Sequence, residues 1–527
     1  MGTKNYNNAL DLVSFSRASG GTALRKISYG SELVTNGTFD TDTTGWTALS
    51  SATLSVASQK LRVTNVGANF GKAEQAITTV VGKVYEWVFE YSGGTSTQYN
   101  YRAGTTSAGI DVVANTPAVS GTNTVYFVAQ STTTYLSFVN DGTDTNYSDW
   151  DNISVKEVLF DQPDGTLTLF NHPDDIPRID YDASGNPKGI LIEEARTNLF
   201  VQSNDFSTQS AVRSTITDNS STSPDGTVSA ARFEDTATSA DHRLDFSAFT
   251  VTSGNTYTYS IFAKAAELNW VRMWFSTDFG TQYANFDLST GSIGVTTGII
   301  SANIEQASNG FYRCSIVGTA TSTGSNGQRL QLGIGDNMIS FTGDGASGIY
   351  IYGAQFEEGA FPTSYIGTSG ASATRSADIA SIDVDQFGYN QKAGAVVVEV
   401  RAEDTDSSVG DVFFQLYDGT SQNSIRFDRY TGNFAIRVED DSVTQVEVPF
   451  PGTEPDTTTT YTVAAAYKLN DFAFIRSGST LGTDTSGTVP DGITDVRISS
   501  GDFNGHIKSI KYYPRRLSNA QLQELTS

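Results

Sequence analysis

Six aromatic side chains in this sequence are candidates for binding sugars. An aromatic ring stacks on the apolar face of a pyranose, and Asp, Asn and Gln side chains bond to the hydroxyl groups. Trp270 and Trp274 are four residues apart in NWVRMWFSTDF, so in a strand both point the same way. The other candidates are Trp46, Tyr99, Tyr101 and Trp150. A sandwich core also needs large aromatic side chains, and this is the alternative role of each candidate.

Residues that carry catalysis in other proteins are scarce here. Three histidines argue against His-based metal or acid–base sites, and a single cysteine, Cys314, excludes a disulfide within one chain. The sequence contains no GxSxG, HExxH, CxxC or P-loop motif. Two carboxylates suffice for a glycosidase, but their spacing across strands cannot be read from a sequence with 58 acidic residues. We therefore predict that the protein is not an enzyme.

The chain is strongly acidic, with 33 basic and 58 acidic residues and a net charge of −25. Such a chain repels nucleic acid and anionic membranes, because binding phosphate requires clustered Lys and Arg. Residues 1–30 differ, with four basic residues against Asp11, which predicts either an anchor for a partner or a solvated tail. There is no signal peptide and no apolar run of the ~20 residues that a membrane helix needs, so we expect synthesis in a cytoplasm.

The elements that must position these side chains are strands. Gly, Ser and Thr are abundant, while long Leu/Ala/Glu/Lys patterns are nearly absent. VYEWVFEYSG (84–93) alternates strictly, with four aromatic residues on one face, which predicts a half-buried strand. The predicted fold class is all-β, with three antiparallel sandwiches of the jelly-roll or concanavalin type. One short C-terminal helix is predicted, where Ser518 caps NAQLQELT.

The chain divides into five predicted segments. Residues 1–30 form an N-terminal anchor, and 31–158 form the first sandwich. An extended connector, 159–189, contains four of the twelve prolines, too many for a central strand. The second sandwich is 190–385, and the third is 386–527, with YTGN and KLND as hairpin turns.

The second sandwich repeats the plan of the first. TVTSGNTYTYSIFAKA (250–265) matches TTVVGKVYEWVFEYSG (78–93), and Gly82 and Gly254 each precede an aromatic residue by three positions. This spacing indicates an internal duplication of architecture.

Three long strings carry a resemblance to a known family. They are SFSRAS (14–19), PRIDYDASGNPKGILIEEARTNLF (177–200) and GAQFEEGAFPTSYIGTSGASATRSAD (353–378). In these strings the chain resembles head-spike or fibre-like virion structural proteins of bacteriophages. The resemblance covers residues 9–27 and about 160–385.

The resemblance implies a projecting protein on the surface of a phage particle, assembled in the host cytoplasm. Its implied partners are other virion proteins, bound through residues 1–30, and host-surface carbohydrate, with no nucleic acid and no membrane insertion. Projecting appendages of this kind are commonly homotrimers. A head spike or decoration protein and a tail fibre remain alternatives. A secreted bacterial glycan-binding protein, or a non-hydrolytic module of a glycosidase, is the alternative of another class.

The first sandwich departs from that family and is interpreted as an inserted module. Its strings NGTFDTDTTGW and DNISVKEV resemble the opening and closing strands of carbohydrate-binding jelly rolls. This resemblance implies a structural calcium ion where the two strands meet, with Asn36, Asp40 and Asp151 as ligands. A solvated acidic loop is the alternative. The third sandwich is similar to laminin-G and concanavalin-like domains, which close with a strand and a pattern like RRLSNAQLQELT.

GILIEEARTNL (189–199) has the character of a junction. Its apolar run would bury against a neighbouring sandwich, while Glu193 or Glu194 pairs with Arg196 or with a backbone amide. The alternative is an ordinary first strand of the second sandwich, followed by a polar turn.

Overall fold

The computed structural model describes residues 12–403, 411–430, 433–449, 459–477, 482–499 and 503–527. Antiparallel sheets make up most of these residues, which confirms the predicted all-β class. α1 (Asn519–Thr526) is the one α-helix of the described residues, and Ser518 forms the predicted capping box with Gln521. None of the helices in this part of the chain is long and apolar enough to cross a membrane. The chain forms two compact units, Lys26–Thr166 and the segment up to Arg25 together with Leu167–Ser527.

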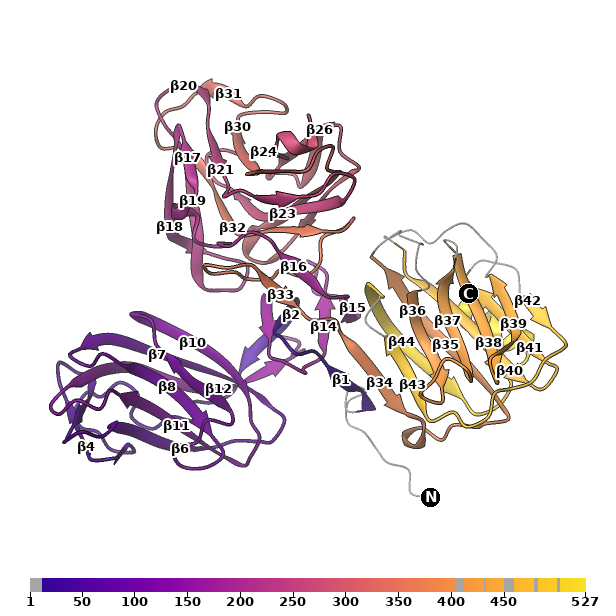
Figure 1. Cartoon of the computed structure of the whole chain (residues 1–527), viewed down its shortest axis with the longest axis horizontal. Coiled ribbons are helices and arrows are strands. Elements are labelled where there is room, and N and C mark those ends of the chain that lie inside the picture. The colour runs from indigo at the N-terminus through magenta and orange to yellow at the C-terminus, as the bar shows by residue number, and fades with distance from the viewer. Residues whose placement is uncertain (1–11, 404–410, 431–432, 450–458, 478–481, 500–502) are drawn as a thin grey trace. The chain divides into compact units, whose positions relative to one another are not determined.

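The unit Lys26–Thr166 is a sandwich of two sheets (Figure 1). One sheet contains the run β4-β5-β12-β7-β10, with β2 also paired to the end of β12, and the other has the order β3-β6-β11-β8-β9. The alternating stretch is β7 (Val84–Gly94), and its aromatic face is buried as predicted. Trp87 and Phe89 of this face pack on Phe138 of the opposite sheet. The other strands are β2 (Gly21–Tyr29), β3 (Thr47–Leu49), β4 (Ala52–Val56), β5 (Leu61–Asn65), β6 (Lys72–Thr78), β8 (Tyr99–Gly104), β9 (Val113–Pro117), β10 (Gly121–Val128), β11 (Thr133–Asn140) and β12 (Tyr147–Phe160).

The second sandwich repeats both five-strand runs of the first sandwich and adds one strand to each run. Its sheets are β18-β19-β32-β23-β28-β27 and β17-β21-β30-β24-β25-β26. The first sheet contains β18 (Ser214–Thr222), β19 (Val228–Asp235), β23 (Thr256–Ala265), β27 (Ser301–Gln306), β28 (Tyr312–Thr319) and β32 (Gly348–Glu358). The second contains β17 (Ser210–Val212), β21 (Arg243–Asp245), β24 (Trp270–Trp274), β25 (Tyr283–Asp287), β26 (Ser292–Thr297) and β30 (Arg329–Gly333). Two-stranded pairs flank them: β16 (Arg196–Asn198) with β33 (Ala373–Arg375), β20 (Ser239–Asp241) with β31 (Ser340–Thr342), and β22 (Phe249–Val251) with β29 (Gly324–Asn326).

The predicted duplication is confirmed in local detail. Gly82 and Gly254 both have a positive φ, 81° and 89°, which a glycine adopts without strain. The next aromatic residues, Tyr85 and Tyr257, each accept a hydrogen bond from the backbone N–H five residues earlier, at 2.9 and 3.0 Å. The same hairpin entry therefore starts the central strand β7 in one sandwich and β23 in the other.

The third sandwich takes edge strands from distant parts of the chain. One sheet has the order β1-β34-β43-β36-β37-β38-β39, and the other has β14-β15-β44-β35-β40-β41-β42. Its early strands are β1 (Ser14–Ser16), β14 (Arg178–Tyr181), β15 (Pro187–Ile192) and β34 (Ile379–Asp383). Its later strands are β35 (Ala393–Ala402), β36 (Asp411–Tyr417), β37 (Ser424–Tyr430), β38 (Asn433–Asp440), β39 (Val443–Pro449), β40 (Tyr461–Lys468), β41 (Phe472–Arg476), β42 (Gly482–Asp484), β43 (Asp495–Ser499) and β44 (Gly505–Tyr513).

This topology changes the predicted segment boundaries. The connector is not merely extended chain, because it contains β13 (Thr166–His172), β14 and the first half of β15. Ile190 and Ile192, placed in the second sandwich by the sequence, lie in the core of the third, because β15 pairs with β44. Part of the predicted anchor is also structural, since Ser14–Ser16 pairs with Ile379–Ser381. Residues 1–11 of that anchor and the centre of the predicted YTGN turn, 431–432, lie outside the described residues.

Candidate functional site

The two tryptophans predicted to bind sugar in the first sandwich belong to its core. Trp150 is 0 % exposed, stacks on Phe138 with ring centroids 4.2 Å apart, and donates its Nε1–H to Ser148 Oγ at 2.7 Å. Trp46 is 7 % exposed and also packs on Phe138. Neither ring presents a free face, and this corrects their assignment as glycan contacts. The sandwich needs their volume inside, which was the alternative role.

Tyr99 and Tyr101, the other predicted contacts in this sandwich, are half-buried on β8 and turned towards the core. Tyr99 stacks on Tyr91 at 4.3 Å, and Tyr101 meets Trp87 edge-on at 5.7 Å. Because side chains alternate along a strand, the residue between the tyrosines and Arg102 after them point to the outer face. Tyr99 and Tyr101 are therefore packed against aromatic residues of the core.

Trp270 and Trp274 occupy the outer face of the second sandwich. Val271 and Met273 between them are buried in the core, so both indoles point outward on β24, as the four-residue spacing predicts. Both indoles are partly exposed. Trp274 lies 5.4 Å from the ring of Tyr283 on the neighbouring strand β25, which extends the aromatic surface.

A row of three side chains beside this surface borders a hollow. Asp245, Arg329 and Trp274 are Cα partners across β21, β30 and β24. Arg329 Nε lies 3.2 Å from Asp245 Oδ1. The hollow has a volume of about 450 Å³ and is closed by residues 275–277, 280–281 and 326–327. An indole ring beside a carboxylate and a guanidinium supplies the apolar platform and the hydroxyl partners that a sugar requires.

A second row lies next to the first on the same outer face. Arg243, Gln331 and Arg272 are Cα partners across β21, β30 and β24. The guanidinium of Arg272 lies 4.1 Å from the centre of the Tyr283 ring, and its Nε–H donates to Asn285 Oδ1 at 2.9 Å. Burial lowers the pKa of Arg272 from its ordinary value. The two rows thus combine aromatic and charged groups on one sheet.

The three predicted calcium ligands lie near the point where the opening segment meets the closing strand. Gly37 O accepts a hydrogen bond from the N–H of Ile153 at 2.9 Å, which joins the two segments there. Asp151 has a buried Oδ1 without a hydrogen-bond partner in the described part of the chain. Burial, with contributions from Glu90 and Asp40, raises the pKa of Asp151. Across the described residues, no three His, Cys, Asp or Glu side chains are grouped so as to hold a metal ion.

Residues of the three strings 14–19, 177–200 and 353–378 come together in a buried ion-pair network. Asp378 lies between two arginines: Arg17 Nη1 is 3.2 Å from its Oδ1, and Arg178 pairs with its Oδ2. All three side chains are 0 % exposed. Arg178 also lies 2.9 Å from Glu193, and Arg375 lies 3.6 Å from the same carboxylate. Residues from four distant segments are thereby joined.

Hydrogen bonds complete this network. Glu193 accepts from the N–H and the hydroxyl of Ser364, both at 2.6 Å. Burial opposes its ionised form, yet Arg375 and Arg178 hold the pKa of Glu193 at about 2. Arg17 donates to the carbonyl of Pro173 at 2.9 Å, and burial lowers its pKa to about 10. Such dense pairing is what a buried charge needs to remain ionised.

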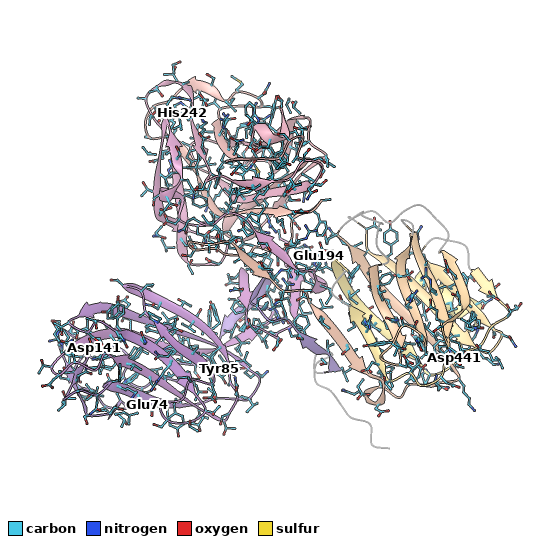
Figure 2. The ribbon with its side chains drawn as sticks, in the orientation of Figure 1. Glu74, Tyr85, Asp141, Glu194, His242 and Asp441 are labelled. Atoms are coloured by element: carbon cyan, nitrogen blue, oxygen red, sulfur yellow. The ribbon has the colours of Figure 1, made fainter. Side chains whose placement is uncertain are left out.

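GILIEEARTNL is therefore a junction, as predicted. Its apolar part forms β15 in the third sandwich, and Asn198 at its end accepts from Phe356 N of the second at 3.0 Å. Glu194 pairs with Arg196, the predicted partner, through an Nε–H bond of 2.6 Å to its Oε1 (Figure 2 labels Glu194). The stretch joins the two sandwiches: Glu194 and Arg196 pair with each other, whereas Glu193 belongs to the buried network with Arg178 and Arg375.

A second polar cluster surrounds a smaller cavity of about 130 Å³. His506 lies between Asp180 and Glu403, with its ring nitrogens 2.9 and 3.0 Å from their oxygens. Lys188 lies 3.0 Å from the same Asp180. Burial disfavours the charged imidazole, but both carboxylates outweigh it and raise the pKa of His506.

Several of these residues were not identified from the sequence. Arg17, Arg178 and Asp378 lie within the strings that mark the resemblance, but nothing in their spacing shows that they meet. Arg272 could have been identified, because it stands between the tryptophans of WVRMW at strand spacing and so shares their face. Gln331 carries no such signal.

No protein-family model and no curated protein match this chain. Among solved structures, it is similar to the N-terminal CBM22-1–CBM22-2 tandem domain of Paenibacillus barcinonensis Xyn10C, with a TM-score of 0.20 and 10 % identity over 63 % of this chain and 98 % of that one. It is also similar to domains LG4-5 of the mouse laminin α1 chain, with a TM-score of 0.20 and 10 % identity over 52 % of this chain and 89 % of that one. At such TM-scores neither likeness bears on function.

Proposed function

We propose that this chain is a non-enzymatic glycan-binding protein and that its binding site is the outer face of the second sandwich. The observation that carries the proposal is Trp274, a partly exposed indole beside Arg329 and Asp245 at the edge of the 450 Å³ hollow. The ring would stack on a sugar, and the charged pair would bond to its hydroxyl groups. Trp270 on the same face would extend the contact along the glycan.

For the whole protein we propose a structural role on the surface of a phage particle, as a projecting head spike, fibre or decoration protein that adheres to host carbohydrate. The support is that the strings that carry the resemblance also supply the residues of the buried network. In this network Arg17, Arg178, Glu193 and Asp378 hold the modules together. A tail fibre carrying the same modules is the second candidate. A homotrimer bound to other virion proteins through residues 1–30 belongs to the same proposal. Labelling of purified particles with an antibody against this chain, followed by electron microscopy, tests it: unlabelled particles would remove the virion role.

A structural calcium ion at Asn36, Asp40 and Asp151 is also a proposal, supported by the buried, unpartnered Oδ1 of Asp151. Bound calcium stabilises the native state by mass action, so chelation should lower the melting midpoint of the full chain. The Asp151→Asn variant should lose that dependence. An equal response of the variant to chelation would contradict the site.

The glycan site is tested with Trp274→Ala on a glycan array. We expect the variant to lose at least about tenfold in apparent affinity, because a buried aromatic contact commonly dominates binding. Phe70→Ala is the matched control, since it removes another exposed aromatic side chain, 51 % exposed, from the first sandwich. Thermal melting of both variants establishes that they fold.

Two outcomes would overturn the site. Undiminished binding by a folded Trp274→Ala variant would place the glycan elsewhere. No glycan bound by the unmodified protein would mean that the sandwiches serve as structural spacers.

A further inference from the structure

The outer faces of the duplicated sandwiches differ in charge. In the first sandwich the central row is Glu74, Ser137 and Arg102, which are Cα partners across β6, β11 and β8. By strand order, these positions correspond to Arg243, Gln331 and Arg272 in the second sandwich. A carboxylate in the first row is thus replaced by an arginine in the second.

In the row of the first sandwich, Glu74 is hydrogen-bonded to groups of the same face. Glu74 (labelled in Figure 2) accepts from Ser137 Oγ at 2.9 Å, from Ser107 Oγ at 2.7 Å and from the N–H of Ala108 at 2.6 Å. The last two donors belong to the loop between β8 and β9, which therefore contacts this face. Burial lowers the pKa of the half-buried Arg102, and the carboxylate of Glu74 opposes this effect. Arg102 Nε has no hydrogen-bond partner among the described residues, so the difference between the two rows is the carboxylate of Glu74, which the second row lacks.

The row of the second sandwich is not satisfied in the same way. Gln331 is 2 % exposed, and its Oε1 has no hydrogen-bond partner among the described residues. Arg272 is 4 % exposed, and within the described part of the chain it donates only to the neutral side chains of Asn285 and Asn337. Leaving a buried amide oxygen unpartnered destabilises a fold, and a sugar hydroxyl that donates to Gln331 Oε1 would relieve this cost.

Arg243 and Arg329 have carboxylate partners, whereas Arg272 has none among the described residues. Arg243 lies 2.7 Å from Asp241 and 3.1 Å from Asp245, and Arg329 lies 3.2 Å from Asp245. The only carboxylate that acts on Arg272 from the described residues is Asp336, which raises its pKa slightly against burial, while its Oδ1 accepts from Val295 N at 2.8 Å. A planar guanidinium without a carboxylate partner is a donor suited to an external carboxylate.

We propose that the second sandwich binds a carboxylate-bearing glycan, with a sugar ring on Trp274 and the carboxylate directed to Arg272 beside Gln331. This inference rests on the proposed glycan site and names its ligand class as acidic sugars such as uronic acids. The ligand carboxylate would take the place that Glu74 occupies for Arg102 in the first sandwich. The corresponding face of the first sandwich would bind no such ligand.

The test measures binding of the full chain to three polyuronates: polygalacturonate, alginate and hyaluronan. Each is presented beside its carboxyl-reduced form, which keeps the polymer but replaces the carboxylate with a neutral hydroxymethyl group. We expect at least one polyuronate to bind about tenfold more tightly than its reduced form, the scale of a lost charge-assisted hydrogen bond.

Two variants of the second sandwich test which residues cause the preference for the acidic polymer. Gln331→Glu places a carboxylate beside Arg272 that would compete with the ligand while pairing with the arginine, so the fold is kept and the preference for the acidic polymer is lost. Arg272→Gln should lose it too. Arg102→Gln, at the corresponding position of the first sandwich, is the matched control and should bind like the unmodified protein.

The outcomes separate this inference from the proposed function. Equal binding to acidic and reduced polymers would overturn the inference and leave the glycan site in place. Loss of the preference in Arg102→Gln, or its retention in a folded Gln331→Glu variant, would also overturn it. If neither acidic nor neutral polymers bind, and a general glycan array is also blank, both proposals fail.

Discussion

At the scale of single residues, the charges of the buried network depend on one another. Asp378 is shared by Arg17 and Arg178, so its loss would leave two guanidinium groups in the interior with a single remaining carboxylate, Glu193, on one of them. Removing one partner of a buried pair is costly, because the remaining charge has left water without compensation.

We therefore expect Asp378→Asn to lower the free energy of unfolding by about 3–5 kcal/mol, measured by urea denaturation. Asp471→Asn is the matched control, because Asp471 pairs with Arg516 at 2.8 Å but is 47 % exposed, and such pairs contribute about 0–1 kcal/mol. Equal stability of the two variants would show that the network is not needed for the fold.

A pH dependence follows from His506. Its pKa is raised in the folded protein above the ordinary value of 6.5, so the bound proton stabilises the native state. This contribution is complete below the unfolded pKa and is lost as the pH rises through the higher folded pKa. Asp180 has the opposite sign: its pKa is lowered from 3.8, so its contribution is present above that value and disappears in acid.

We expect the melting midpoint to fall as the pH is raised from about 6 to about 9. In His506→Gln, which cannot titrate, this fall should be smaller. Differential scanning calorimetry measures the melting midpoint of both proteins across the pH range. Parallel curves would show that His506 does not cause the fall.

At the scale of elements, the first strand is part of the third sandwich. β1 pairs with β34 at the edge of one sheet, and Arg17, which follows it directly, is fully buried against Asp378. The N-terminal segment is thus required by the fold from residue 14 onward, whatever it binds in addition.

Deletion of residues 1–27 removes the edge strand β1, the buried cation of Arg17 and most of β2. The loss of β1 and Arg17 should destabilise the third sandwich. Deletion of residues 1–11 alone keeps β1 and Arg17 and serves as the control. Limited proteolysis followed by mass spectrometry should show faster cleavage after residue 379 in the longer deletion only. Identical cleavage of the two would mean that β1 is dispensable.

At the scale of the whole molecule, a net charge of −25 opposes approach to an anionic cell envelope. Adhesion must then come from short-range contacts, such as the Trp274 face, which are individually weak and gain strength when several copies bind together. Long-range repulsion is screened by salt over a Debye length of about 10 Å at 0.1 M, whereas contacts inside a hollow are screened less.

The rate of adsorption to an anionic glycan surface should therefore rise between about 10 and 150 mM salt, while the dissociation rate changes little. Surface plasmon resonance on immobilised glycan separates the two rates. A fall in the association rate with added salt would indicate attraction by a basic surface and would contradict this account.

The sequence alone determined those features that depend on short spacings. Alternation identified the aromatic face of β7, the four-residue spacing placed Trp270 and Trp274 on one face, and Ser518 marked the helix start. The duplication was visible because a glycine stands three residues before a tyrosine in each module, and in the structure both glycines have a positive φ. Local patterns of this kind reflect the geometry of a single element.

Only the tertiary structure decided which residues meet. The burial of Trp150, the pairing of β1 and β15 with the third sandwich, and the shared carboxylate of Asp378 all join segments more than a hundred residues apart or on opposite sheets. The row of Arg243, Gln331 and Arg272 is likewise set by strand register. Register depends on the simultaneous packing of both sheets, so it leaves no signal in the neighbouring residues of the sequence.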